Sequence, residues 1–188
     1  MHYSHKKNTF APTNTQHTMI NIRTATPDDA EALLAIYDPY VIKTGITFEL
    51  EPPTVDEFRQ RITNTLKKFP YLVATTDDGE ILGYCYAGTL RTRPAYNHCV
   101  EMSIYIREDS HGKGIGKALY TEIEKRLKAM GKINLYASIT WVDDENCHLN
   151  HLSPKFHEHM GYKKVGHFHR CGYKFGEWFD MIWMEKFI

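Results

Sequence analysis

The chain has 188 residues, and its 23 basic and 23 acidic side chains give a formal net charge of zero. The length suits one domain with a sizeable core, and the charge lacks the basic excess typical of proteins that bind nucleic acids or anionic membranes. No apolar run approaches the roughly 18 residues of a transmembrane helix. We therefore expect neither nucleic acid nor membrane as a partner.

The cysteines and histidines give no motif for a disulfide framework or a metal centre. The four cysteines are scattered without a C-x-x-C pair, which favours a reduced, cytoplasmic protein. Histidines occur two apart at His157 and His159 and at His167 and His169, so each pair could share a strand face. Because no H-E-x-x-H or Cys/His cluster accompanies them, we expect no metal site.

The first half of the chain alternates predicted helices with short strands. Residues 1–18 are polar without an apolar period, and we interpret them as a flexible extension of a domain at 19–188. A Thr26 N-cap followed by Pro27 predicts a helix start. The expected elements are a strand at 20–25, helices at 26–45 and 54–66, strands at 71–75 and 81–87 around a hairpin turn at 77–79, and a strand at 99–106.

A glycine-rich turn follows the strand at 99–106. Gly112, Gly114 and Gly116 precede an amphipathic helix that ends at Gly131. The backbone N–H groups of such a turn, at the positive end of a helix dipole, suit a phosphate or pyrophosphate. The alternative is a tight turn that binds no ligand.

The rest of the chain contains further strands and one short helix. We expect a strand at 133–139, a loop at 141–149, a helix at 155–160, and strands at 162–168 and 175–184 joined by a turn at 171–173. This order mixes antiparallel hairpins with helical crossovers. It predicts an α+β or mixed-sheet α/β domain.

The order of elements and the run from His111 to Gly116 resemble the GNAT superfamily of acyl-CoA-dependent N-acetyltransferases. The usual turn of that family is Arg/Gln-x-x-Gly-x-Gly/Ala, and it holds the pyrophosphate of coenzyme A. Gly114 and Gly116 match this turn, whereas His111 stands where Arg or Gln is usual. The resemblance implies a central twisted mixed sheet flanked by helices and acetyl-CoA as the acyl donor.

Several motifs resemble, more narrowly, the phosphinothricin and methionine sulfoximine acetyltransferases. They lie at 46–49, 91–96, 100–106, 150–158, 161–162 and 172–180. Each motif is weak alone, but the set is specific in combination. This resemblance implies a small amino-acid-like amine as substrate and a homodimeric enzyme.

The resemblance also implies which residues contact acetyl-CoA. The strand before the turn would polarise the thioester carbonyl with its N–H groups, the turn would bind the pyrophosphate, and Asn150 would bind the pantetheine arm. The expected residues are Ile104, Tyr105, Ile106, His111, Gly112, Lys113, Gly114, Ile115, Gly116, Lys117, Asn150 and Ser153. For the two lysines, the alternative is a solvated helix surface.

Acetyl transfer to an amine requires a base for the ammonium and an acid for the leaving thiolate. Glu101 matches the catalytic carboxylate position of the family, and His157 stands where many relatives place a tyrosine that protonates the thiolate. Histidine can also donate a proton, with an ordinary pKa of about 6.5. The alternatives are a surface glutamate at a strand end and a packed helix histidine.

A zwitterionic substrate also needs a partner for its carboxylate, and arginine can bind a carboxylate with two hydrogen bonds. Arg91 and Arg93 are the candidates, with Phe48 and Tyr96 as walls of the side-chain pocket; an exposed loop and core aromatics are the alternatives. The expected substrate-binding residues are Phe48, Glu49, Arg91, Arg93, Tyr96 and Lys174.

The leading hypothesis is therefore an acetyl-CoA-dependent N-acetyltransferase of a small amino-acid-like amine. Two alternatives stay open: a protein or peptide N-terminal acetyltransferase, and a non-catalytic acyl-CoA sensor on the same fold. The sequence leaves the physiological amine open.

Overall fold

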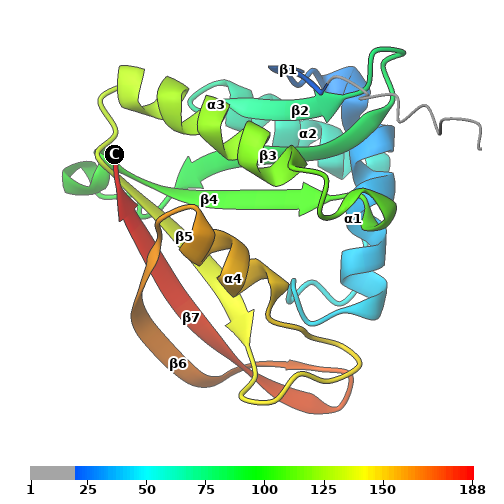
Figure 1. Cartoon of the computed structure of the whole chain (residues 1–188), viewed down its shortest axis with the longest axis vertical. Helices are drawn as coiled ribbons and strands as arrows, with labels where there is room; N and C mark the ends of the chain where they lie inside the picture. Colours follow the sequence, from blue (N-terminus) through cyan, green and yellow to red (C-terminus); the bar gives the residue numbers. More distant parts are fainter. Residues whose placement is uncertain (1–19) are drawn as a thin grey trace, which may run out of the picture.

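The computed structural model describes residues 20–188, and the extension expected at 1–18 lies outside this part of the chain. Within it, seven strands form one mixed sheet in the order β1-β2-β3-β4-β5-β7-β6. The strands are β1 (Asn21–Thr24), β2 (Tyr71–Thr75), β3 (Ile81–Thr89), β4 (Cys99–Ile106), β5 (Asn134–Trp141), β6 (Lys163–Lys174) and β7 (Glu177–Phe187). The mixed-sheet fold predicted from the sequence is confirmed (Figure 1).

Four α-helices in the described residues flank this sheet. They are α1 (Ala30–Lys43), α2 (Val55–Leu66), α3 (Ile115–Ala129) and α4 (Leu152–His159), with short 3-10 turns at Pro27–Asp29, Pro94–Tyr96 and Glu108–Ser110. The expected helix starts are confirmed by two capping boxes, Thr26 with Asp29 and Thr54 with Glu57. None of the helices at 20–188 is long and apolar enough to span a membrane.

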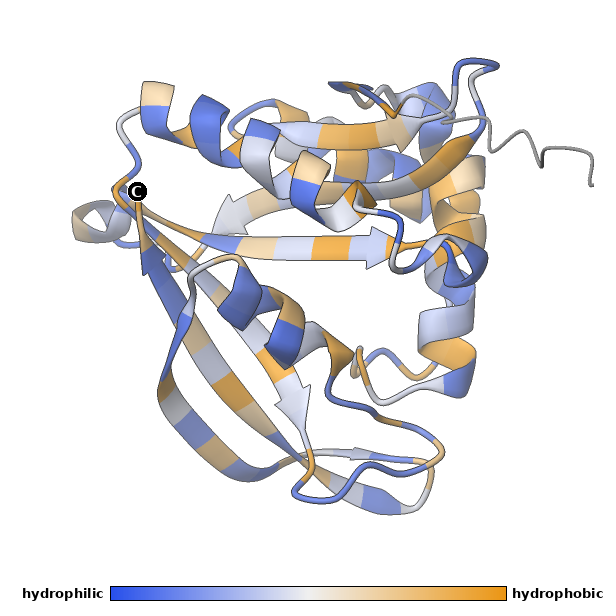
Figure 2. Ribbon diagram, viewed as in Figure 1, coloured by the Kyte–Doolittle hydropathy of each residue, from blue (hydrophilic) through white to orange (hydrophobic). Residues whose placement is uncertain are grey.

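The two faces of the sheet carry separate cores. Ile115, Leu119, Ile123 and Leu127, at helical spacing on α3, pack on one face. Tyrosines and apolar residues of α1, α2, β2 and β3 fill the other face. Figure 2 shows how apolar positions recur along the strands and on α1. Strands β2 and β3 therefore send alternate side chains to α3 and to α1 and α2.

The sheet opens between β4 and β5. These strands are parallel and pair only from Cys99 to Glu101, opposite Asn134 to Tyr136. Beyond Glu101, β4 stays paired with β3 and β5 with β7, so the two strands diverge (Figure 1). Among the described strands, none pairs with 102–106 on the β5 side, which leaves backbone polar groups there for a ligand.

The turn expected at 171–173 is wrong. Strand β6 continues to Lys174, and the hairpin turn is Phe175 and Gly176, with φ values of 54° and 78°. Gly172 serves another purpose, because a Cβ at this position would lie 2.3 Å from Cζ of Phe48. The glycine admits a close tertiary contact, which a turn-like sequence signal does not distinguish from a turn.

Candidate active site

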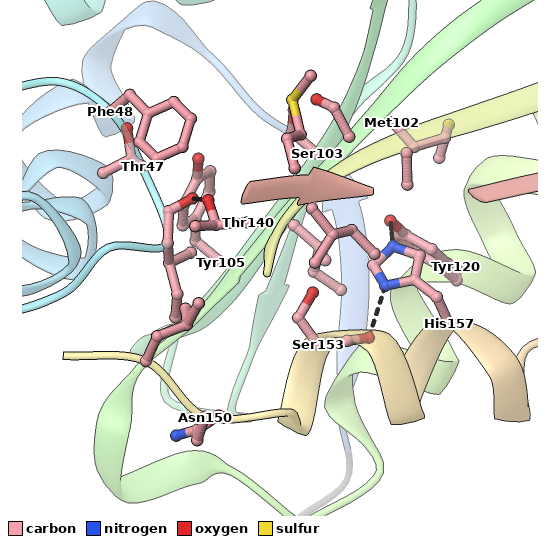
Figure 3. Close-up of a pocket in the computed structure, with 17 residues that line it drawn as sticks. Thr47, Phe48, Met102, Ser103, Tyr105, Tyr120, Thr140, Asn150, Ser153 and His157 are labelled. Atoms are coloured by element: carbon pink, nitrogen blue, oxygen red, sulfur yellow. Dashed lines mark hydrogen bonds between the residues drawn. The ribbon is translucent and has the colours of Figure 1, made fainter. Parts of the chain in front are cut away.

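A cavity of about 220 Å³ lies where β4 and β5 diverge. Residues 102–105 of β4 and 137–140 of β5 form its walls, and the loop at 46–48 and the start of α4 close it. Figure 3 shows Thr47 and Phe48 at one end and Tyr120, Ser153 and His157 at the other. The divergence of the strands thus creates a partly open pocket whose lining includes side chains from both sides of the sheet.

Glu101 is the last β4 residue that pairs with β5. Its neighbours Val100 and Met102 belong to the α3 core, so the Glu101 side chain lies on the opposite face, toward α1 and α2. The Ser138 hydroxyl donates a 2.6 Å hydrogen bond to the Glu101 carboxylate. A half-buried carboxylate is therefore held at the point where the cavity begins.

The loop at 46–49 is fixed from two sides. Tyr37 and Thr47 share a hydrogen bond of 2.8 Å between their hydroxyls. The Lys174 ammonium donates to the Thr47 carbonyl at 2.8 Å and is only 5% exposed; burial lowers its pKa. Lys174 was expected to bind substrate, but the structure places it behind the loop and not in the cavity wall. Phe48 does line the cavity.

Glu49 lines a second cavity of about 340 Å³, which shares Tyr105 with the first. The Arg61 guanidinium of α2 lies 2.6 Å from the Glu49 carboxylate at this cavity. Four further tyrosines contribute to the lining, namely Tyr37, Tyr71, Tyr84 and Tyr86. Sequence reasoning missed Arg61, because an arginine on an amphipathic helix resembles an ordinary surface residue.

The segment between β3 and β4 carries the remaining residues that were expected to bind substrate. These are Arg91, Arg93 and Tyr96, and all three are exposed. The Arg91 guanidinium lies 5.9 Å from the ring centre of Trp183, whose register partner is Ser138. Arg91 is thereby brought toward the Glu101 face of the sheet. Arg93 and Tyr96 line neither of the two cavities.

His157 is a buried residue of α4 and belongs to a hydrogen-bonded chain that reaches the cavity. Its Nδ1 lies 2.8 Å from the Ser153 carbonyl, which can only accept, so Nδ1 carries the proton. Its Nε2 therefore accepts from the Tyr120 hydroxyl at 2.9 Å (Figure 3). Burial lowers the pKa of His157 to about 4, so the imidazole is neutral at pH 7. Sequence reasoning missed Tyr120, whose spacing on α3 is that of a core residue.

The glycine turn leaves its backbone open to a ligand. Gly112 and Gly114 have φ values of 74° and 80°, and a Cβ on either would have no heavy atom within 4 Å. Gly114 is the N-cap of α3 and has no side chain, so it cannot cap the first helical N–H groups. The adjacent Lys113 and Lys117 are exposed. These features fit the anion site expected from the sequence.

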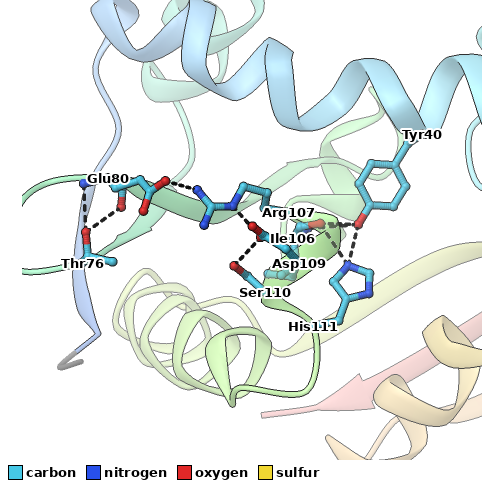
Figure 4. Close-up of polar contacts among 8 residues, drawn as sticks. All are labelled: Tyr40, Thr76, Glu80, Ile106, Arg107, Asp109, Ser110 and His111. Carbon is cyan, nitrogen blue, oxygen red and sulfur yellow. Dashed lines mark hydrogen bonds and ion pairs between the residues drawn. The ribbon is translucent and has the colours of Figure 1, made fainter. Parts of the chain in front are cut away.

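His111 points away from those N–H groups. Its Nε2 lies 3.0 Å from the Tyr40 hydroxyl and 3.0 Å from the Ile106 carbonyl (Figure 4). Burial is the main cause that raises the pKa of Tyr40 to about 12, so this phenol stays protonated. Arg107 holds the same loop by ion pairs with Glu80 and Asp109. The histidine thus joins the turn to α1, and its expected phosphate contact stays a prediction.

A family model described as "Acetyltransferase (GNAT) domain" matches residues 22–183. The chain belongs to the GNAT acetyltransferase family. It is an N-acetyltransferase, and its acyl donor is acetyl-CoA.

Curated relatives of this GNAT chain match along most of its length. A phosphinothricin N-acetyltransferase of Streptomyces coelicolor is 32% identical over 89% of this chain and 95% of its own. An L-methionine sulfoximine/L-methionine sulfone acetyltransferase of Pseudomonas aeruginosa is also 32% identical, over 88% of this chain and 92% of its own. The narrower resemblance read from the sequence motifs is therefore confirmed.

Solved GNAT structures share the fold. A Sinorhizobium meliloti phosphinothricin acetyltransferase in complex with AcCoA is 31% identical with a TM-score of 0.80, and covers 90% of this chain and 88% of its own. A Brucella melitensis structure described as a ribosomal-protein-alanine N-acetyltransferase is 30% identical with a TM-score of 0.81, and covers 89% and 99%.

The residues of this GNAT domain fit acetyl-CoA. The free β4 edge offers backbone groups to an extended pantetheine arm, as an added strand would use them. The glycine turn offers N–H groups to the pyrophosphate. Asn150 and Ser153, at the start of α4, line the cavity between these two features.

Proposed function

We propose that this enzyme acetylates the amino group of a small amino-acid-like substrate of the phosphinothricin or methionine sulfoximine/sulfone type. The observation that carries the proposal is the Glu101 carboxylate, which is held by Ser138, a residue that lines the cavity of about 220 Å³. A cavity of this size suits a small molecule better than a peptide backbone. The names of the relatives from Streptomyces and Pseudomonas support this substrate class.

Glu101 acts as the general base in this proposal. When bound, acetyl-CoA supplies an acetyl group as an activated thioester. Most aliphatic amines are protonated at neutral pH, so a carboxylate or a water beside it accepts the proton before the amine attacks directly. The hydrogen bond from Ser138 orients the carboxylate. The Ile104 N–H at the free β4 edge polarises the carbonyl, since the Tyr105 N–H faces β3 and the Ile106 N–H donates to the Tyr40 hydroxyl at 3.4 Å.

The proton for the leaving thiolate is proposed to come from the Tyr120 and His157 pair. The Nδ1 proton of His157 is held by the Ser153 carbonyl, and its Nε2 carries none. Tyr120 keeps its proton because burial raises its pKa, and it lines the cavity. Its hydroxyl is therefore the group of this pair that can turn toward the thiolate. This proposal modifies the expected role of His157 from donor to partner of the donor.

Arg91 is proposed to bind the substrate carboxylate. It is exposed and lies on the Glu101 side of the sheet, next to Trp183. Arg61 is the competing cation, but its guanidinium already pairs with Glu49 at 2.6 Å. Phe48 and Tyr105 would then contact the substrate side chain, since both line the cavity.

The test is a panel of amines with acetyl-CoA, read by release of free thiol. Phosphinothricin, methionine sulfoximine and methionine sulfone should be acetylated in preference to a peptide with an N-terminal alanine. The peptide is included because of the Brucella structure and its name. Preference for the peptide would overturn the substrate class, and tight acetyl-CoA binding without turnover of any amine would favour a sensor.

We also propose a homodimer in the cytoplasm. Aromatic and apolar side chains on β6 and β7 are exposed, with Tyr173 at 56%, Trp178 at 57% and Phe168 at 51%. Such a patch suits a partner surface. Light scattering after gel filtration should give twice the chain mass of 21.9 kDa. The four cysteines are all free thiols, which is in keeping with a reducing compartment.

A further inference from the structure

Two histidines and an aspartate converge on the β6–β7 hairpin, and none of them lines the two cavities. His167 Nε2 lies 2.7 Å from Asp180 Oδ2, and His169 Nδ1 lies 2.9 Å from the same oxygen. All three atoms lie within 4.8 Å of one another. Each is a good ligand for a transition metal.

The backbone of β6 creates this convergence. The register of β6 against β7 shifts between Phe168 and Gly172, and Arg170 within the shift has a φ of 48°. The Arg170 N–H donates to Asp180 Oδ1 at 2.7 Å, which fixes the carboxylate and turns Oδ2 toward the two imidazoles. The imidazole rings lie 4.2 Å apart at their centres. This hydrogen bond is also the main cause that lowers the pKa of Asp180, so the carboxylate is ionised.

We propose that His167, His169 and Asp180 bind a divalent transition-metal ion of the Zn²⁺ type. Two imidazole nitrogens and one carboxylate oxygen are a common three-ligand set for zinc, with water as the fourth ligand. Bonds of about 2.0–2.2 Å place tetrahedral ligands roughly 3.3–3.6 Å apart. Both nitrogen–oxygen distances, 2.7 and 2.9 Å, are shorter than this, so the side chains rotate slightly apart to admit the ion. The ion takes the place of the two protons that now bridge the imidazoles to the carboxylate, and each proton moves to the other nitrogen of its ring, so both imidazoles stay neutral.

The positive charge of the Lys164 ammonium disfavours a cation at this site. This ammonium lies 3.2 Å from His167 Nδ1 and 5.0 Å from the ring centre of Trp141. With an ion on Nε2, Nδ1 carries a proton and no longer accepts from Lys164. The lysine is exposed and can turn into solvent. Removal of its charge should therefore strengthen metal binding, roughly two- to fivefold for an exposed charge interaction.

The sequence shows the two histidines but not the site. Asp180 follows His169 by 11 residues and lies on the next strand. The two histidines also differ in the nitrogen that faces the carboxylate, Nε2 in His167 and Nδ1 in His169. No linear motif contains this information.

The test uses the full chain after treatment with EDTA. Titration calorimetry with Zn²⁺ and visible absorption with Co²⁺ should both show one equivalent bound. His169→Ala, at a side chain that is 75% exposed, should weaken binding at least tenfold without unfolding the protein. Lys164→Met should strengthen it. His159→Ala is the matched control, since it removes an exposed histidine outside the cluster, and it should change nothing.

A second readout is thermal unfolding. A ligand that binds only the folded state stabilises it by mass action. At one fixed Zn²⁺ concentration, the Tm of the wild type and of His159→Ala should therefore rise by more than that of His169→Ala. Absence of saturable binding at one equivalent, or equal binding by His169→Ala and the wild type, would overturn the proposal.

Discussion

Ser138 of β5 donates a hydrogen bond of 2.6 Å to the carboxylate of Glu101, the last residue of β4 that pairs with β5. The Glu101 carboxylate is therefore oriented at the place where β4 and β5 separate. Ser138, which lines the cavity between these strands, also orients the proposed general base. Substitutions at Glu101 and at Ser138 can therefore distinguish the proposed base from the residue that orients it.

Glu101→Gln should lower kcat/KM for the amine by about 10²–10⁴, the range for loss of a general base. The amide keeps the shape of the side chain and an oxygen that accepts from Ser138. The dissociation constant of acetyl-CoA should therefore change little. Steady-state thiol release and calorimetry with acetyl-CoA measure the two quantities. Unchanged turnover at neutral pH would exclude Glu101 as the base.

Ser138→Ala is the companion variant, because it removes the support and keeps the carboxylate. A hydrogen bond to a charged group contributes about 1.5–3 kcal/mol. Turnover should fall by roughly tenfold or more, but less than in Glu101→Gln. The double variant should be no slower than Glu101→Gln alone, since Ser138 acts through Glu101. Additive losses would show that Ser138 acts independently.

His157 should make the stability of the protein depend on pH. Its pKa is about 4 in the folded state because of burial, whereas an unfolded histidine has a pKa of about 6.5. Below pH 6.5 the unfolded state therefore takes up a proton that the folded state refuses, and stability falls with pH until about pH 4. Linkage gives a loss of about 2 kcal/mol from this group between pH 7 and pH 5.

Urea unfolding at pH 7 and pH 5 measures this effect. Between pH 7 and pH 5, the free energy of unfolding of His157→Phe should fall by about 2 kcal/mol less than that of the wild type. His159→Phe is the control, since His159 lies two residues away on the same helix but is exposed, and it should retain the wild-type loss. Equal pH dependence of all three proteins would contradict a buried neutral His157.

The sequence predicts the region from β4 to α3 well, since the apolar period there changes from two to 3.6 across a glycine turn. The turn predicted at 171–173 is wrong, because Gly172 is required by its close contact with Phe48, a residue more than a hundred positions away in the chain. The same limit applies to the site. Ser138 and Tyr120 each lie 37 residues from their hydrogen-bond partners, and both have the spacing of ordinary strand and helix residues.

Gly172→Ala tests the support of Phe48. The added methyl would lie 2.3 Å from Phe48 Cζ, so the ring or the β6 backbone must move. Overpacking of this kind costs typically about 1–3 kcal/mol of stability. The KM for the amine should rise, because Phe48 lines the cavity, while the KM for acetyl-CoA should stay near the wild-type value. Gly166→Ala is the matched control, since Gly166 lies on the same strand and a Cβ there would meet nothing closer than Trp183 Cβ at 3.6 Å.

Arg91→Ala and Arg61→Ala should separate the two candidate partners of the substrate carboxylate. The loss of a charge-assisted contact of about 1.5–3 kcal/mol should raise KM for methionine sulfone in Arg91→Ala by roughly ten- to a hundredfold. For the matching amine without a carboxylate, Arg91→Ala and the wild type should have similar KM values. Arg61→Ala should affect both amines alike, because Arg61 already pairs with Glu49. A carboxylate-dependent effect in Arg61→Ala alone would move the substrate into the tyrosine-lined cavity and reverse the assignment.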